Sequence, residues 1–143
     1  MGVDIKKGLE GVTIAESALS FIDGEKGILR YRGYDINDLA ESASFEEVAY
    51  LLWFGELPHK KQLSTFDKEL KDQRALPSAV LKWIKTFPKD AHPLDVLRTV
   101  VSALALYDKS AHDVSRDETI RKGIKLTAAF PTIIAAFERI PKN

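Results

Sequence analysis

Three glycines lie within the stretch FIDGEKGILRYRGYDI, residues 21–36, and glycine-rich loops are a common cradle for phosphate groups. Gly24, Gly27 and Gly33 follow neither the G-x-G-x-x-G dinucleotide pattern nor the Lys-Ser/Thr ending of a phosphate-binding loop. Instead, Asp23-Gly24 lies between two apolar runs, and Asp-Gly in that setting favours a hairpin turn. We therefore expect a β-hairpin over about residues 19–32 and no bound ligand.

Histidines are the next candidates for chemistry, and the chain has His59, His92 and His112. No two of them are spaced as H-x-x-x-H, and the chain has no cysteine, so a zinc site lacks its usual ligands. His92 precedes Pro93, where we expect a capping or surface role. His59 lies among lysines and His112 in a polar linker, and we expect both to be exposed. The sequence predicts no metal site.

The residues that could act as nucleophiles or bind anions form no recognisable motif either. No G-x-S-x-G motif marks a serine nucleophile, although a triad assembled in space is not excluded by spacing. Trp53 and Trp83 lie at helical spacing among aliphatic residues, which favours a core or interface role. Arginines bind carboxylates well, but on helices they more often form ion pairs with neighbouring side chains. The candidate arginines are Arg30, Arg32, Arg98, Arg121 and Arg139. From residue chemistry alone we predict no catalytic, cofactor-binding or metal-binding residue.

Composition narrows the class of protein. The 143 residues suffice for one domain, and 21 basic residues balance 21 acidic ones, so no excess of positive charge attracts nucleic acid or an anionic membrane. The absence of cysteine fits a reducing compartment. The N-terminus lacks the layout of a signal peptide, and the longest nearly uncharged stretch, residues 99–107, is too short to span a bilayer. We expect a soluble, cytoplasmic protein with no nucleic-acid or membrane partner.

Most of the chain has helical patterning with clear end signals. Asp35 is placed to cap a helix from 36 to about 41, and Ser44 with Glu47 forms a capping-box pattern whose helix ends at Gly55. Further helices are expected over 60–73, 77–86 and 92–108. In the last of these, two overlapping apolar stripes predict burial on more than one side. They consist of Leu94, Leu97, Val101 and Leu104, widened by Val96, Val100, Ala103 and Leu106.

A second capping box, Ser115 with Glu118, opens the last predicted helix, which extends to about residue 139. Pro131 is expected to break or kink it, since proline removes one backbone hydrogen bond and clashes with the preceding turn. The predicted fold class is all-α with a small N-terminal β-hairpin.

Five segments in order resemble the N-terminal part of citrate synthases. They are GLEGV at 8–12, SFIDGEKGILRYRGYDINDLAE at 20–41, SFEEVAYLLWFGELP at 44–58, HPLDVLRTVVSAL at 92–104 and FPTIIAAFERI at 130–140. The likeness covers nearly the whole chain and is greatest to the short prokaryotic form. It implies that residues 1–143 are the N-terminal portion of a large helical domain, with the small domain and the C-terminal part absent.

The resemblance also implies an activity. Citrate synthases are homodimeric transferases that condense acetyl-CoA with oxaloacetate at the entry to the tricarboxylic acid cycle, without a metal, and close relatives use propionyl-CoA to make 2-methylcitrate. An aspartate removes a proton from the acyl group, one histidine stabilises the enol and a second polarises the oxaloacetate carbonyl. In the family these residues, the carboxylate-binding arginines and the CoA-binding segment follow the stretch that ends here with FERIPKN. We therefore expect the two catalytic histidines and the catalytic aspartate beyond Asn143, and none is assigned to a position in this sequence.

Two interpretations follow. In the first, the chain is the N-terminal piece of a citrate synthase, or of a 2-methylcitrate synthase, and is inactive alone. In the second, it is a non-catalytic helical interaction or scaffold module. The wide apolar faces of 94–106 and 124–137 favour the first, because such faces are normally covered by other helices or a partner subunit.

Overall fold

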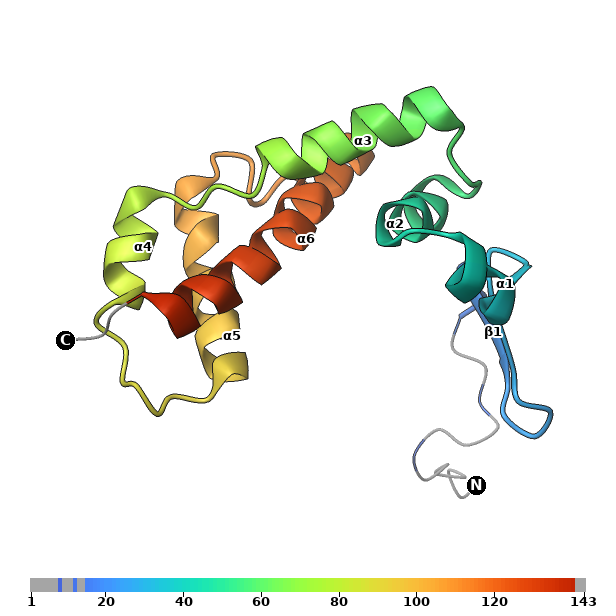
Figure 1. Ribbon diagram of the computed structural model, residues 1–143, viewed down its shortest axis with the longest axis horizontal. Coiled ribbons are helices and arrows are strands. Elements are labelled where there is room, and N and C mark those ends of the chain that lie inside the picture. The colour runs from blue at the N-terminus through green and yellow to red at the C-terminus, as the bar shows by residue number, and fades with distance from the viewer. Residues whose placement is uncertain (1–7, 9–11, 13–14, 141–143) are drawn as a thin grey trace, which may run out of the picture. The chain divides into compact units, whose positions relative to one another are not determined.

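The computed structural model describes residues 8, 12 and 15–140 (Figure 1). Of the block GLEGV, residues 9–11 lie outside the described part, and so does the segment from Pro141 to Asn143, beyond which the catalytic residues are expected. The chain divides into two compact units at the boundary between Pro58 and His59, and each unit is described by itself below. No helix in the described part of the chain is both long enough and apolar enough to cross a membrane.

The first unit begins with the predicted hairpin. Strands β1 (Ser20–Asp23) and β2 (Ile28–Tyr31) pair antiparallel, with Ser20 opposite Tyr31 and Asp23 opposite Ile28. The backbone N–H of Lys26 donates to the Asp23 carboxylate and closes the turn. The predicted hairpin is thus confirmed, and Gly24 and Gly27 belong to its turn.

A third strand, β3 (Tyr34–Asp35), extends this sheet and was not predicted. It pairs with β2 through a turn at Arg32 and Gly33, whose φ angles are 50° and 91°. Two consecutive positive φ angles produce the tight hairpin turn that matches the natural twist of paired strands. The third glycine of the opening stretch therefore has a conformational role.

Two short helices complete the first unit, and both begin and end as predicted. Helix α1 (Ile36–Ser42) is capped by Asp35, whose carboxylate accepts from the Asn37 N–H. Helix α2 (Phe45–Phe54) begins with the capping box of Ser44 and Glu47 and ends at Gly55, which has a φ of 94°. Near its end, the Leu52 carbonyl accepts a hydrogen bond from the Arg32 guanidinium at 3.0 Å. The β2–β3 turn is thus fastened to the last turn of α2.

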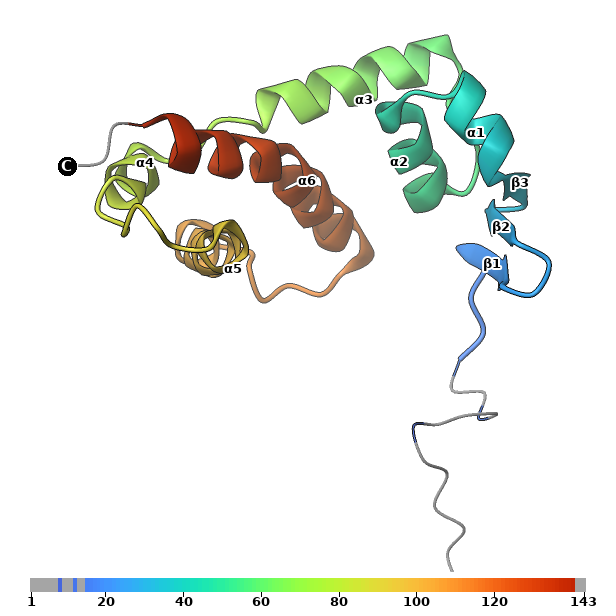
Figure 2. The ribbon, with the colours of Figure 1, turned by 60° about the horizontal axis from the view of Figure 1, so that its bottom comes forward.

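The second unit is helical (Figure 2). Its elements in chain order are α3 (Lys60–Asp72), α4 (Ser78–Ile84), α5 (Pro93–Leu104), the short 3₁₀ helix η2 (Ala105–Tyr107) and α6 (Arg116–Arg139). Helix α6 contacts α3, α4 and α5. The predicted fold class, all-α with a small N-terminal β element, is therefore confirmed.

The core of the second unit lies between α4, α5 and α6. It consists of Val80, Ile84, Val96, Val100, Leu104, Ala129, Ile133 and Phe137, each at most 4% exposed. On α5 the buried stripe is Val96, Val100 and Leu104, one residue every four. Leu94, expected in the first apolar stripe, and Leu106, expected to widen it, are 66% and 85% exposed, because they lie beside the buried stripe and no described element covers them.

The last helix corrects two sequence expectations. Helix α6 continues unbroken through Pro131, which is exposed, so the predicted break is wrong. The packing of Ile133 and Phe137 in the core holds the residues after the proline in helical register. The capping box at Ser115 is also absent: Ser115 makes no side-chain cap, and Glu118 instead accepts from Arg121 Nε at 2.8 Å.

Gly55 provides a test of the first unit. We expect Gly55→Ala to weaken the end of α2 by about 1 kcal/mol, because an L side chain is strained at this positive φ although space for a Cβ is open. Amide hydrogen exchange at residues 51–55 should become about fivefold faster. Gly24→Ala is the control, since a Cβ there also meets open space and the φ is not positive. Equal effects of the two substitutions would contradict this explanation.

Candidate functional site

The three histidines have structural or surface positions. His59 and His92 each precede a helix, and each accepts a backbone N–H through Nδ1, from Gln62 at 3.4 Å and from Leu94 at 3.3 Å. His59 thus caps α3 in place of a serine or threonine, and His92 has the capping role expected of it. His112 is exposed in the linker before α6. Among the described residues, no three His, Asp or Glu side chains converge as a metal site would require.

Two of the arginines form the ion pairs expected on helix faces, Arg98 with Asp95 and Arg121 with Glu118. Arg32 does not follow that expectation, because it donates to the Leu52 carbonyl. Its Nε is buried and has no hydrogen-bond partner in the described part of the chain. Trp83 packs edge-on against Phe87 but is 40% exposed. Its position is therefore intermediate between the core and the surface.

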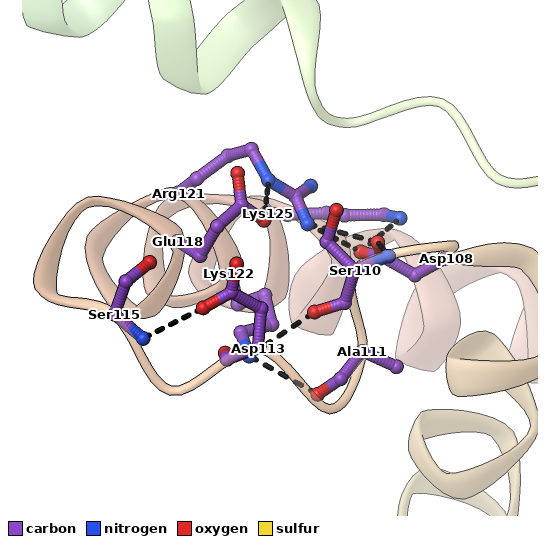
Figure 3. Close-up of polar contacts among 9 residues, drawn as sticks. All are labelled: Asp108, Ser110, Ala111, Asp113, Ser115, Glu118, Arg121, Lys122 and Lys125. Carbon is purple, nitrogen blue, oxygen red and sulfur yellow. Dashed lines mark hydrogen bonds and ion pairs between the residues drawn. The ribbon is translucent and has the colours of Figure 1, made fainter.

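The densest polar cluster in the described residues lies where the linker after η2 meets α6, and sequence reasoning missed it (Figure 3). The Asp108 carboxylate accepts two hydrogen bonds from Arg121, at 2.8 and 2.9 Å, and one from Lys125 at 3.2 Å. Its side chain is only 12% exposed. Arg121 and Lys125 are four residues apart and so project from the same face of α6.

This environment stabilises the ionised form of Asp108. Its pKa is lowered from 3.8 to about 2, chiefly by the Arg121 hydrogen bonds and further by Lys125 and the Ser110 N–H, against the opposing effect of burial. The hydrogen bonds of Arg121 to Asp108 and to Glu118 raise the pKa of Arg121. A carboxylate held this firmly in the anionic form is a poor general base, since it gives up its charge only in strong acid.

Lys122 holds the linker through backbone carbonyls. Its ammonium donates to the carbonyl oxygens of Ser110, Ala111 and Asp113 (Figure 3). The Asp113 carboxylate in turn accepts from the Ser115 N–H at 2.8 Å, which lowers the pKa of Asp113 and fixes the entry to α6. Consecutive turns of one helix therefore hold both ends of the linker over residues 108–115.

A pocket of about 190 Å³ opens beside this cluster. It is lined by Val101, Leu104, Ala105, Asp108, Ala111, Lys122, Lys125 and Leu126. Its walls are mainly apolar, and its charged groups are one carboxylate and two ammonium groups. The arrangement has no nucleophile and no free base, so it is a candidate binding site and lacks the groups of a catalytic centre.

Comparison with known proteins gives a consistent result. Residues 8–143 match the family model described as "Citrate synthase, C-terminal domain". The chain is 48% identical to a citrate synthase of Haloferax volcanii over 100% of its own length and 39% of that protein. It is 44% identical to 2-methylcitrate synthase 2 of Corynebacterium glutamicum, over 92% of this chain and 34% of that one. The chain thus spans little more than a third of the length of these relatives.

The solved structures that resemble this chain are also citrate synthases. Citrate synthase from Thermotoga maritima is similar with a TM-score of 0.82 and 38% identity, over 94% of this chain and 34% of that chain. Citrate synthase from Thermoplasma acidophilum, solved as a ternary complex with carboxymethyl coenzyme A and oxaloacetate, gives a TM-score of 0.85 at 27% identity, over 98% and 38% of the two chains.

The Asp108 cluster makes a prediction about pH. The pKa of Asp108 is about 2 in the folded protein and near 3.8 in the unfolded chain. The Asp108 carboxylate therefore stabilises the fold above about pH 4, and this stabilisation is lost as the pH falls towards 2. Asp108→Asn should lower the free energy of unfolding at pH 7 by about 1 to 2 kcal/mol, a value discounted because Arg121 is 38% exposed.

Urea unfolding of both proteins at pH 7, 4 and 3 measures this difference, which should shrink as the pH falls. Asp95→Asn is the matched control, because the Asp95–Arg98 pair is exposed and worth less than about 1 kcal/mol. A difference between wild type and Asp108→Asn that stays constant with pH would contradict the assignment.

Proposed function

Because this chain belongs to the citrate synthase family, we propose that it is the N-terminal part of an enzyme that condenses acetyl-CoA with oxaloacetate to give citrate and CoA. The observation that carries the proposal is a sequence likeness of 48% over the full chain together with a fold likeness of TM-score 0.82. The placement at the N-terminal side rests on the order of the five segments. The family model that matches residues 8–143 is nevertheless named for a C-terminal domain.

The catalytic groups of this reaction are proposed to lie beyond Asn143. The family uses two histidines and an aspartate, whereas His59 and His92 cap helices here and Asp108 is held as a paired anion. The role proposed for this chain is to supply part of the helical scaffold on which those groups are carried. Both substrates are water-soluble, and a cytoplasmic location without a metal cofactor is part of the proposal.

Exposed apolar side chains support assembly into a larger protein. On α5 and α6, Leu94, Phe130 and Ile134 are 66%, 39% and 47% exposed. Trp83 and Leu106 are also exposed and line a hollow together with residues of α5. Apolar surface of this kind is typically covered by other parts of a protein or by a partner. We propose that the remaining chain and a second subunit cover it in a homodimeric enzyme.

A 2-methylcitrate synthase is the second candidate. Relatives of that activity match at 44% and 45% identity, close to the values for citrate synthases. The two enzymes differ in the acyl group, acetyl or propionyl, that is transferred from CoA. We propose that this choice is made by residues outside the 143 of this sequence.

The chain by itself should be inactive. With acetyl-CoA or propionyl-CoA and oxaloacetate, we expect no release of free CoA thiol above the rate without protein. We also expect self-association or binding of a hydrophobic dye through the exposed apolar side chains. Thiol release by the pure chain would place catalytic residues within it. A dye-negative monomer would favour a self-standing, non-catalytic helical module.

A chimera tests whether this chain can support citrate synthase activity when the rest of an enzyme is present. The chain replaces the matching segment of the Haloferax volcanii citrate synthase, to which it is 48% identical. We expect thiol release with oxaloacetate, and an acetyl-to-propionyl preference equal to that of the parent enzyme. The same chimera with Ile133→Asp should lose activity, because a carboxylate would enter the core position of a residue that is 0% exposed. A folded chimera without activity would overturn the proposal.

A further inference from the structure

The pocket beside Asp108 has the size and lining of a site for a small molecule. Its walls are formed by Val101 and Leu104 of α5, Ala105 of η2, Ala111 of the linker and Leu126 of α6. Its volume is about 190 Å³. An apolar cavity of about 150 Å³ is enough to hold benzene, so this one has room for a single ring or a short branched chain with one small substituent.

The charges at the pocket select the sign of that substituent. Two ammonium groups, Lys122 and Lys125, line the pocket with one carboxylate, Asp108. The three acceptors of Lys122 are neutral backbone carbonyls, and Asp108 is shared between Arg121 and Lys125 (Figure 3). The lining alone has two cations and one anion, but with Arg121, Asp113 and Glu118 beside it the whole cluster is neutral. A preference for an anion must therefore come from a single ammonium group placed at the pocket.

Lys125 is the group able to meet an incoming anion. Its hydrogen bond to Asp108, at 3.2 Å, is longer than the two from Arg121, at 2.8 and 2.9 Å. Its side chain is 26% exposed, so Lys125 is not sealed in the core. If Lys125 turns to a ligand, Asp108 retains its two bonds to Arg121 and stays paired.

We propose that this pocket binds a small organic monoanion: a compact apolar body, aromatic or branched, inserted between α5 and α6, with its carboxylate on the Lys125 ammonium. The proposal goes beyond the proposed function and does not rest on it. Oxaloacetate does not fit this description, because it carries two carboxylates and has no apolar body to contact Leu104 and Leu126.

Benzoate is the probe for the test, with benzamide as its neutral counterpart and benzylammonium as the cation. Each is titrated into the 143-residue chain while the methyl NMR signals of Leu104, Ala111 and Leu126 are followed. We expect saturable shifts with benzoate, binding of benzamide weaker by about fivefold or more, and none with benzylammonium or oxaloacetate. No saturable shift with benzoate, or equal binding of benzoate and benzamide, overturns the proposal.

Variants of the chain locate the site. Lys125→Met keeps an unbranched side chain and removes the charge, and it should weaken benzoate binding about fivefold while leaving benzamide binding unchanged. Lys68→Met is the matched control, since Lys68 also pairs with an aspartate, Asp72, but lies on α3 away from the pocket lining. Ala111→Leu should fill the pocket and abolish binding of both probes. Equal effects of Lys125→Met and Lys68→Met would overturn the assignment to this pocket.

Two controls separate the proposal from other outcomes. Circular dichroism checks that each variant is folded, and if Ala111→Leu is not, the comparison of Lys125→Met with benzamide still decides. The methyl signals are also recorded against protein concentration without ligand. Shifts of the pocket methyls that depend on protein concentration alone would mean that a second copy occupies the pocket, and they would overturn the proposal.

Discussion

The packing of α5 against α6 is the constraint on which the second unit depends. Val96, Val100 and Leu104 of α5 lie in one core with Ala129, Ile133 and Phe137 of α6, and burying each larger aliphatic side chain contributes about 1.5–3 kcal/mol. No buried polar or charged residue interrupts this core in the described part of the chain. Because the two helices are fixed side by side, the linker of residues 108–115 must return along α6. This return brings Asp108 next to Arg121 and Lys125.

Features that depend on neighbouring residues were predictable from the sequence. The cap at Asp35, the capping box of Ser44 and Glu47 and the left-handed end at Gly55 each need only a few adjacent residues, and all three are present. Features that depend on distant residues were not. Glu118 is taken by Arg121, and Arg121 is turned towards Asp108, thirteen residues earlier. No periodicity in the sequence indicates that contact, and none showed that Leu94 and Leu106 would remain uncovered.

The family relationship shows what the resembling segments have in common. Citrate synthases of known structure match this chain over nearly all of its length but over little more than a third of their own. What is shared is the helical framework, and the segments that carry the resemblance are helix starts, turns and core stripes. The glycines of residues 21–36 belong to this framework. Gly33 is required by the backbone angles of the β2–β3 turn, and Arg32 beside it holds that turn to α2.

Three carbonyl oxygens converging on one point, as those of Ser110, Ala111 and Asp113 do, resemble the oxygen cage that proteins use for a monovalent metal ion. Here the ammonium of Lys122, a side chain of α6, takes the place of such an ion and is covalently tethered to the protein. A tethered ion has a high effective concentration that dilution and dialysis do not change. A sodium or potassium ion could therefore reach these three carbonyl oxygens only by displacing the tethered ammonium.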